Sequence, residues 1–377
     1  MAENVLERMK RIDADKKIAD FMAKEKLPYS VKVKYARIRA QEFVRECEKR
    51  DLNYHVSVGG LDSITLFLFL KSIGIDAYGI SVSHLEDKSI QQIHKQLGIE
   101  CIKSAVHHVD DDGTVHYWTK PTILQEFGFP VLSKEIAAKI ELLANPSEKN
   151  KTVRHAIITG ETGEYGGYQT DSRMKLAQKW LELFGGYANE EEGTNYKIPP
   201  FSVSSKCCYY LKEKPCDDWA KAHNSVPFLG LMASEGGRRA KSLRVNGCNN
   251  FGATTIRSAP FAIFHRQDIL QLALDLKVQI PEIYGEILRR ENGTLYTTKA
   301  QRTGCSMCGF GIHIEKRPHR FDLLREHNPK EWEYWMYRCV TDQKTGEKYG
   351  WGSVLDYIGV GWENDWRTDL VGQIGMF

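Results

Sequence analysis

The amino-acid sequence predicts an α/β protein whose strands form a parallel sheet. Two observations carry this prediction: short β-prone segments alternate with segments of helical length, and the first strand ends at a diglycine turn that opens a helix. The 377 residues suffice for two domains, or for one large domain with an extension. A composition of 42% hydrophobic and 27% charged residues indicates a globular protein and excludes a disordered chain.

Residues 1–50 are predicted to form a solvated helical arm, because apolar residues recur there at helical spacing among dense charges. Residues 54–58 (YHVSV) are short and β-prone, and they stop at Gly59-Gly60. Residues 63–72 are apolar and have the length of a helix. The order is therefore strand, glycine turn, helix.

The same alternation continues along the chain. Residues 77–83 and 100–103 are predicted strands that flank a helix at 88–97, and a helix at 134–143 precedes a strand at 155–159. Because parallel strands need right-handed crossover helices, this order predicts a Rossmann-like sheet. A glycine-rich turn at 159–167 would then lie at the carboxyl edge of the sheet.

These patterns divide the chain into three parts. An N-terminal helical arm covers residues 1–50, and an α/β domain covers residues 51–257. Residues 160–205, rich in Gly, Tyr, Glu and Asn around a helical stretch at 174–184, are predicted to leave the sheet as an excursion or lid. Residues 258–377 form a C-terminal region that begins with a helix at 268–276 and ends in a tryptophan-rich tail.

Charge and hydropathy indicate the cellular compartment of the protein but do not identify its partner. The 52 basic and 49 acidic residues give a net charge of +3, which by itself implies neither a nucleic-acid nor a membrane partner. The apolar stretch Ile64–Leu70 is too short to span a bilayer, and residues 1–27 do not contain the apolar core of a secretory signal. We therefore expect a cytoplasmic protein without a transmembrane helix, whose nine cysteines serve metal or redox chemistry rather than disulfides.

The first candidate site is the loop Ser57-Val58-Gly59-Gly60-Leu61-Asp62-Ser63. Two glycines permit a tight turn, and successive N–H groups at a helix N-terminus form a nest for a phosphate. Asp62 is a candidate Mg²⁺ ligand and Ser63 a candidate phosphate contact. The alternative is an ordinary strand-to-helix turn in which Asp62 caps the helix.

The second candidate site consists of two cysteine pairs. Cys207-Cys208 lie in KCCYYLKEKP, and Cys305 and Cys308 lie far along the chain in RTGCSMCGFG. If the fold brings these pairs together, four thiolates fit either a tetrahedral Zn²⁺ site or an iron–sulfur cluster. The alternative is four unrelated buried thiols.

Both motifs carry a family resemblance. The loop resembles the S-G-G-x-D-S loop of the PP-loop ATP pyrophosphatase superfamily, which cleaves ATP between its α- and β-phosphates. The pattern CC-x-x-x-K-x-x-P with a distant T-G-C-x-x-C resembles the [4Fe–4S]-binding pattern of the PAPS (phosphoadenosine phosphosulfate) and APS (adenosine phosphosulfate) reductase family. The relatives of that family include the ATP pyrophosphatase subunit of DNA phosphorothioation systems.

This resemblance extends through residues 230–240 and, before the second cysteine pair, through stretches between 258 and 285. It implies a fold like that of the adenine nucleotide alpha hydrolases, with a C-terminal helical region that completes a [4Fe–4S] site on Cys207, Cys208, Cys305 and Cys308. It also implies a nucleotide site, in which Asp62 and Ser63 act catalytically. The nucleotide-binding residues of that site would be Ser57, Gly59, Gly60, Asp62, Ser63, Glu235, Arg238 and Arg239.

Arginines suit this role because guanidinium groups bind phosphate and sulfate bidentately, and Lys241 and Arg244 would extend the basic segment. A solvated basic loop is the alternative. The expected reaction is an ATP pyrophosphatase or adenylating sulfur transfer with Mg²⁺ and ATP or a related adenosine nucleotide. A sulfur-donor protein would be a partner, and a nucleic-acid acceptor stays open.

Two other functions stay open. Reductases of this family use a C-terminal Glu-Cys-Gly-x-His thiol, whereas this sequence ends in VGQIGMF and its last cysteine, Cys339, is not followed by Gly-x-His. A sulfonucleotide reductase that releases sulfite would need Cys339 or a partner's thiol as nucleophile, and a structural thiol is the simpler interpretation of Cys339. The third alternative is a catalytically silent nucleotide-binding module.

Overall fold

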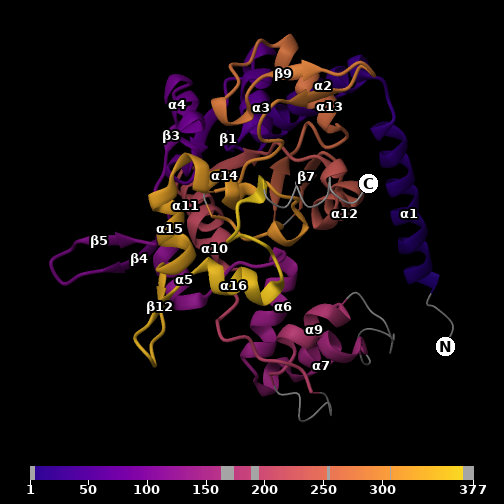
Figure 1. Cartoon of the computed structure of the whole chain (residues 1–377). Coiled ribbons are helices and arrows are strands. Elements are labelled where there is room, and N and C mark those ends of the chain that lie inside the picture. The colour runs from indigo at the N-terminus through magenta and orange to yellow at the C-terminus, as the bar shows by residue number, and fades with distance from the viewer. Residues whose placement is uncertain (1–4, 163–173, 188–194, 253–254, 306, 368–377) are drawn as a thin grey trace. The chain divides into compact units, whose positions relative to one another are not determined.

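A computed structural model describes residues 5–162, 174–187, 195–252, 255–305 and 307–367, shown as the coloured ribbon in Figure 1. The chain forms two compact units, and each is discontinuous in sequence. The sheet unit consists of Met1–Lys103 and Lys214–Ser306, and the helical unit of Ser104–Glu213 and Met307–Phe377. The predicted domain boundaries after residues 50 and 257 do not coincide with the boundaries of these units. Within the described residues, the structure contains no helix that is both long and apolar enough to cross a bilayer.

The sheet unit contains a six-stranded sheet with the order β3-β2-β1-β6-β8-β7. All neighbours pair in parallel except β7, which runs antiparallel to β8 at one edge. The α/β class and the mostly parallel sheet predicted from the sequence are thereby confirmed. The strands are β1 (Asn53–Ser57), β2 (Tyr78–Ser81), β3 (Glu100–Cys101), β6 (Ser225–Phe228), β7 (Asn249–Phe251) and β8 (Ile256–Ser258).

One face of this sheet is covered by α2 (Tyr29–Lys49), α3 (Leu61–Ser72) and α4 (Lys88–Gln96). Val56 of β1 is in register with Gly79 and Phe228 on the neighbouring strands, so these residues share that face. A Cβ atom on Gly79 would lie 2.4 Å from Ile99 and 3.0 Å from Phe67 of α3. Glycine at this position therefore allows α3 to pack closely on the sheet.

The other face is covered by α11 (Lys214–Ala222) through Trp219. His55, Tyr78 and Ile80 alternate with the residues of the first face, as the two-residue period of a strand requires. The Trp219 ring contacts His55 at 5.2 Å and Tyr78 at 5.6 Å between ring centroids. Helices therefore pack on both faces of the sheet, which is typical of parallel sheets.

The predicted N-terminal arm is helical, and it consists of α1 (Val5–Glu25) followed by α2. The expectation that this whole segment is solvated is wrong for α2, because Ala36, Ala40, Phe43 and Cys47 are buried in the core of the sheet unit. Their spacing of three or four residues places them on one helix face. Apart from the buried Lys32, the charges of α2 are exposed or half-buried, and their number obscured this stripe in the sequence.

Two further helices and a hairpin complete the sheet unit. The remaining elements are α12 (Gly237–Asn246), α13 (Arg266–Asp275), β9 (Ile287–Arg289) and β10 (Leu295–Thr297). The α13 helix confirms the helix predicted at 268–276. Lys32 of α2 and Asp268 of α13 form a nearly buried ion pair at 2.7 Å, which joins the two helices.

The helical unit packs around an aromatic core that includes Phe129, Phe184, Phe321 and the fully buried Trp351. In the described part of this unit, the strands form two antiparallel hairpins, β4 (Val106–Val109) with β5 (Val115–Tyr117) and β11 (Val340–Thr341) with β12 (Lys348–Tyr349). The principal helices are α5 (Lys120–Phe127), α6 (Lys134–Ala144), α7 (Lys151–Thr159), α9 (Gln178–Phe184), α10 (Lys206–Cys208), α14 (Arg320–His327), α15 (Pro329–Tyr337) and α16 (Trp351–Ile358).

The strand predicted at 155–159 is wrong, because these residues end helix α7. Arg154, Ile157 and Ile158 are buried on one face of this helix, at the i, i+3, i+4 spacing of an amphipathic helix. A short apolar run such as HAIIT does not distinguish a strand from a buried helix segment. The glycine-rich turn that follows therefore does not lie at the edge of a sheet strand, and most of it, with part of the 160–205 excursion, lies outside the described residues.

Candidate functional site

The predicted phosphate loop lies where the strand order of the sheet reverses. The chain runs outward from β1 to β2 and β3, and then returns to β6 on the other side of β1. In open α/β sheets, the crevice outside the carboxyl ends of two such strands is the usual ligand site. Residues 58–60 follow β1, and Gly230 follows β6. A Cβ atom on Gly230 would lie 3.2 Å from the Cα and backbone N of Ser63, so the two loops are in close contact.

Hydrogen bonds within the sheet unit fix the shape of the loop. The Gly59 N–H donates to the Ser63 Oγ at 2.7 Å, and the Ser63 hydroxyl donates to the Gly60 carbonyl at 2.9 Å. His94, a buried residue of α4, lies with its Nε2 2.8 Å from the Gly59 carbonyl oxygen. In this structure Ser63 therefore holds the turn, and a phosphate contact would require its hydroxyl to change partners.

Tyr284 caps the helix that follows the loop. Its hydroxyl accepts a hydrogen bond from the Leu61 N–H at 3.1 Å and lies 2.7 Å from the Thr303 Oγ1. A Cβ atom on Gly60 would lie 2.3 Å from the Tyr284 hydroxyl oxygen, so a larger residue here would displace the loop or the Tyr284 side chain. Burial raises the pKa of Tyr284, which keeps the phenol protonated.

Two backbone donors of the loop stay open. Within the part of the chain that the structure describes, the N–H groups of Gly60 and Asp62 have no hydrogen-bond acceptor. They lie at the start of α3, where the helix dipole places partial positive charge. These donors are the features of the loop that suit a phosphate oxygen.

Asp62 forms an ion pair with Arg266, the first residue of α13. Arg266 also donates through Nη2 to the Gln301 carbonyl at 3.0 Å. The Asp62 side chain is 28% exposed. Burial raises the pKa of Asp62 above its usual value, although the Arg266 charge acts in the opposite direction. The loop therefore presents a carboxylate, Asp62, in the first turn of α3, with the cation Arg266 paired to it.

Glu235 and two more arginines extend this charged group. The Arg239 Nη1 lies 2.9 Å from the Glu235 Oε2, and the Arg302 Nη1 lies 3.8 Å from the Glu235 Oε1. The charges of Glu235 and Arg302 both act on the pKa of Asp62, so these side chains are electrostatic neighbours of the loop. The predicted residues Asp62, Ser63, Glu235 and Arg239 therefore share one site.

Other residues of the predicted basic segment have different positions. Arg238 lies in the first turn of α12, and its side chain is outside what the structure describes. Arg244 forms an ion pair at 3.1 Å with Glu25, whose side chain is only 7% exposed. Arg244 therefore anchors α12 to α1 and is not available to a phosphate. Ser57 is the last residue of β1, in register with Ile80, and is half-buried.

Sequence reasoning missed Arg266 and Arg302. Both lie outside the glycine-rich loop and the segment at 230–240, and their positions depend on how α13 and the chain near residue 302 fold back to the sheet. No motif surrounds Arg266, and Arg302 directly precedes the T-G-C-x-x-C pattern, which indicated a cluster and not a nucleotide site. Such residues are found only when the fold is known.

Cys207 and Cys208 lie in α10, immediately before a π-helical segment, Tyr209–Glu213. A π-helix widens the turn at a cost in stability, and such segments are frequent at functional sites. Cys207 is buried and Cys208 half-buried. Both belong to the helical unit, as does Cys308, whereas Cys305 belongs to the sheet unit. Convergence of the four thiols stays a prediction.

The segment after Cys308 is held firmly within the helical unit. The Cys308 carbonyl accepts a hydrogen bond from Arg320 at 3.1 Å. Phe310 forms a β-bridge with Leu132, and a Cβ atom on Gly309 would lie 2.1 Å from the buried Trp351 ring. The backbone that presents the half-buried Cys308 is therefore part of the core and not a free loop.

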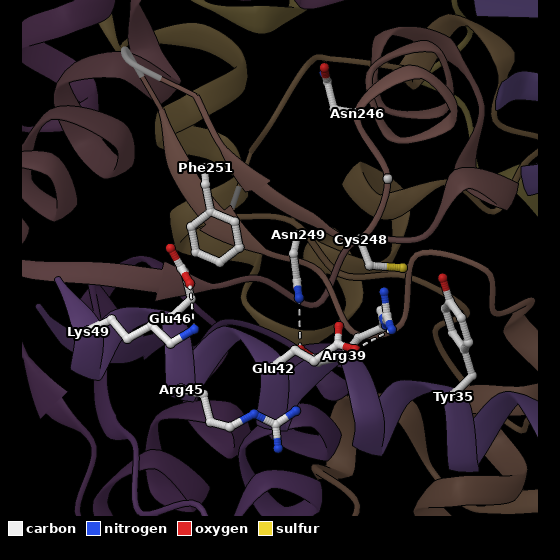
Figure 2. Close-up of a pocket in the computed structure, with 11 residues that line it drawn as sticks. Tyr35, Arg39, Glu42, Arg45, Glu46, Lys49, Asn246, Cys248, Asn249 and Phe251 are labelled. Atoms are coloured by element: carbon white, nitrogen blue, oxygen red, sulfur yellow. Dashed lines mark hydrogen bonds and ion pairs between the residues drawn. The ribbon is translucent and has the colours of Figure 1, made fainter. Parts of the chain in front are cut away.

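A separate pocket of about 600 Å³ lies between α2 and β7 in the sheet unit (Figure 2). Its charges are largely paired: Arg39 lies 2.5 Å from Glu42, and Lys49 lies 3.6 Å from Glu46. Burial raises the pKa of the Cys248 thiol in this pocket to about 11, so it is protonated at neutral pH. None of the predicted nucleotide-binding residues lines it.

Comparison of the chain with protein-family models, with curated proteins and with solved structures gave no match.

Proposed function

We propose that this protein is an enzyme of the PAPS reductase type that binds ATP, or a related adenosine nucleotide, at the loop Gly59 to Ser63. The observation that carries the proposal is the pair of open N–H groups on Gly60 and Asp62 at the reversal of the strand order. A phosphate oxygen placed there would receive both hydrogen bonds and the positive end of the α3 dipole. The proposed reaction is ATP pyrophosphatase chemistry that leads to sulfur transfer.

In this reaction a nucleophilic acceptor attacks the α-phosphorus of ATP. The bond between that phosphorus and the bridging oxygen breaks, pyrophosphate leaves with the electron pair, and the acceptor becomes adenylated. A sulfur donor then displaces AMP. The acceptor class, whether nucleic acid or small molecule, is not part of the proposal.

The charged residues of the site have separate roles in this proposal. The guanidinium groups of Arg239, Arg266 and Arg302 would neutralise the phosphates and the leaving pyrophosphate. Asp62 and Glu235 are the carboxylates that would hold Mg²⁺ bound to the nucleotide. The ion pair of Asp62 with Arg266 must then open when the nucleotide binds, because the carboxylate oxygen that faces Arg266 would face the metal instead.

The cysteines are proposed to hold a [4Fe–4S] cluster through Cys207, Cys208, Cys305 and Cys308. The donor set fits such a cluster chemically, since it offers four thiols, and the π-helical turn after Cys208 is consistent with a specialised site. When bound, the cluster would link two regions of the chain and alter the electrostatic field near the sulfur chemistry. The role of the protein residues is to supply thiolates and to hold their backbone in place.

The alternative of a sulfonucleotide reductase that uses Cys339 receives no support from its surroundings. Cys339 is buried, and its Sγ lies 3.3 Å from the Trp335 carbonyl oxygen. Burial raises the pKa of this thiol to about 12. A nucleophilic cysteine requires an accessible thiolate, so Cys339 is better explained as part of the core of the helical unit.

One experiment separates the three functions. The purified protein is incubated with Mg²⁺ and each of ATP, APS and PAPS, with thioredoxin and with candidate acceptors. Pyrophosphate release from ATP would support the proposed function. Sulfite release from APS or PAPS would support the reductase, and bound nucleotide without turnover would support a silent module. Failure to bind any of the three nucleotides would contradict the proposal.

The cluster has its own test. Anaerobically purified wild-type protein should be brown and contain iron and acid-labile sulfide, and Cys305→Ser should lose both. Cys101→Ser is the matched control, because Cys101 is an exposed cysteine at the end of β3. A colourless wild type with stoichiometric zinc would overturn the cluster and leave the nucleotide site untouched.

A further inference from the structure

A second group of chemistry-bearing side chains lies on the β4–β5 hairpin of the helical unit, labelled in Figure 1. β4 (Val106–Val109) pairs antiparallel with β5 (Val115–Tyr117). The turn between them is closed by two backbone hydrogen bonds, from the Asp110 N–H to the Thr114 carbonyl and from the Gly113 N–H to the Asp110 carbonyl, each of 2.9 Å. The hairpin is therefore a locally determined scaffold.

Two histidines lie directly opposite each other on this scaffold. His108 of β4 is in register with His116 of β5, and their rings are stacked with centroids 4.4 Å apart and planes at 7°. Opposite residues on an antiparallel pair point to the same face, so both imidazoles project from one side. Their Nε2 atoms face the same carboxylate, that of Asp110, at 3.3 Å for His108 and 2.7 Å for His116.

These three side chains offer a ready set of metal ligands. One ligand atom of each residue lies within 4.8 Å of the other two. Zinc binds imidazole nitrogen and carboxylate oxygen at about 2.0–2.2 Å, so ligands of one ion lie a few ångströms apart and the observed set is close to that spacing. Side-chain exposures of 50%, 45% and 45% for His108, Asp110 and His116 leave the group accessible to an ion from solvent.

The surroundings also fix one of the rings. The His108 Nδ1 lies 2.9 Å from the His107 Nδ1, and the His107 Nε2 lies 3.3 Å from Glu126 of α5. The His107 ring in turn contacts the Trp118 ring at 4.0 Å between centroids. Protein metal sites commonly use such outer hydrogen bonds to orient a ligating imidazole, which leaves the other nitrogen for the metal.

We propose that His108, Asp110 and His116 form a zinc site that ties the two strands of the hairpin together. Two imidazoles and one carboxylate favour a late first-row divalent ion and disfavour Mg²⁺ and Ca²⁺, which prefer sites built of oxygen. Three protein ligands leave a fourth position for water or for a ligand from another molecule. This proposal does not depend on the proposed function, because none of its residues belongs to the nucleotide loop or the cysteine pairs.

The test must distinguish this site from zinc bound by cysteines. Full-length protein is titrated with Co²⁺, a spectroscopic substitute for zinc, and with Zn²⁺ by calorimetry. Cobalt on the hairpin should give an absorption spectrum without a sulfur-to-metal charge-transfer band. Cu²⁺ bound to the hairpin should show coupling to two nitrogens by electron paramagnetic resonance.

The decisive variant is His116→Gln, with His327→Gln as the matched control, because His327 is an exposed histidine at the end of α14. His116→Gln should weaken the thiolate-free site by about 100-fold or more, since even outer-shell changes cost about 10- to 100-fold. It should also reduce the nitrogen coupling from two to one, and His327→Gln should change neither. Circular dichroism checks that the variants fold.

Two results would overturn the proposal. One is that wild type and His116→Gln bind Co²⁺ and Zn²⁺ equally well. The other is that all cobalt bound by wild-type protein shows the thiolate band. Hydrogen exchange gives an independent measurement: Zn²⁺ should slow amide exchange across residues 106–117 in wild type and not in His116→Gln.

Discussion

The two ends of the same parallel strands differ sharply in what their polar groups do. At the carboxyl end, Gly60 and Asp62 present open N–H groups, and the ion pair of Asp62 with Arg266 lies beside them. At the amino end, a pocket of about 610 Å³ opens beside Tyr78 and Trp219. In this second region the aromatic rings stack on one another, and the buried His55 lies with its Nδ1 2.8 Å from the Ser225 hydroxyl.

The proposed nucleotide site therefore does not coincide with this spacious pocket of the sheet unit. The amino-end pocket is spacious, yet Trp219 donates its N–H to Glu100 at 3.3 Å and stacks on His223 with centroids 4.0 Å apart. The Trp219 N–H, the Glu100 carboxylate and the His223 ring therefore already interact with one another within the protein. Among the described residues, the N–H groups of Gly60 and Asp62 at the carboxyl end have no acceptor, and burial raises the pKa of the Asp62 carboxyl. A charged ligand would therefore form more new hydrogen bonds and ion pairs at this end of the strands.

The largest effect is expected for Asp62→Ala, which removes the carboxylate at the mouth of the loop. If Asp62 holds the nucleotide's metal ion, pyrophosphate release should fall about 10³-fold, equivalent to roughly 4 kcal/mol of transition-state stabilisation. Asp76→Ala is the control, since Asp76 is an exposed acid that lines the amino-end pocket. Equal rates of pyrophosphate release by wild type and Asp62→Ala would show that the carboxylate at the carboxyl end of the strands does not take part in the reaction.

The next effect concerns the amino end and its buried histidine. Burial lowers the pKa of His55 to about 4, whereas an unfolded histidine has a value of 6.5. Between these values the unfolded state binds more protons, so stability is lost as the pH falls from 6.5 to 4, by roughly 3 kcal/mol in all. Above pH 6.5 this contribution is constant.

Chemical unfolding across this pH range measures the effect. His55→Gln should have a shallower loss of stability with acid than wild type, and His223→Gln should keep most of the wild-type slope. Identical slopes for wild type and His55→Gln would show that His55 is not held neutral by its buried position.

A smaller effect is expected for Gly60→Ala, which tests the close packing of the loop. The added Cβ would lie 2.3 Å from the Tyr284 hydroxyl oxygen, so the loop or Tyr284 must move. Nucleotide affinity should fall about tenfold, or roughly 1.4 kcal/mol. In the double variant Gly60→Ala/Tyr284→Phe the clashing oxygen is gone, and affinity should partly recover relative to Gly60→Ala. Full affinity in Gly60→Ala itself would mean that the nucleotide does not use this turn.

The smallest effect is expected for Tyr78→Ala at the amino end. Tyr78 is 55% exposed and stacks on Trp219 at an interplanar angle of 17°. Loss of this pair should lower the free energy of unfolding by about 1 kcal/mol and leave nucleotide affinity unchanged. A fall in affinity instead would show that the amino-end pocket takes part in binding.

The sequence predicted the alternating order of strands and helices well where each element had its own pattern. The segment from β1 to α4 is an example, because a strand, a diglycine turn and an apolar helix follow one another with clear boundaries. The prediction failed at α7, where a short apolar run was read as a strand although its i, i+3, i+4 burial shows a helix. It also missed the buried face of α2, because charged residues are frequent along that helix.

The candidate site was predictable only in part for a similar reason. Gly59, Gly60, Asp62 and Ser63 are adjacent in sequence, so local chemistry identified them. Arg266 and Arg302 reach the same site through tertiary packing, and no local pattern assigns either of them to a phosphate. The histidines of the β4–β5 hairpin were missed because the pairing of His108 with His116 depends on the strand register, which the sequence does not state.

A crystal structure of the protein with a non-hydrolysable ATP analogue and Mg²⁺ would show whether the loop after β1 binds the nucleotide phosphates. We predict phosphate oxygens within hydrogen-bond distance of the Gly60 and Asp62 N–H groups, and Arg266 moved from Asp62 toward the phosphates. An analogue bound instead beside Tyr78 and Trp219, at the opposite end of the strands, would show that the loop Gly59 to Ser63 is not the nucleotide site.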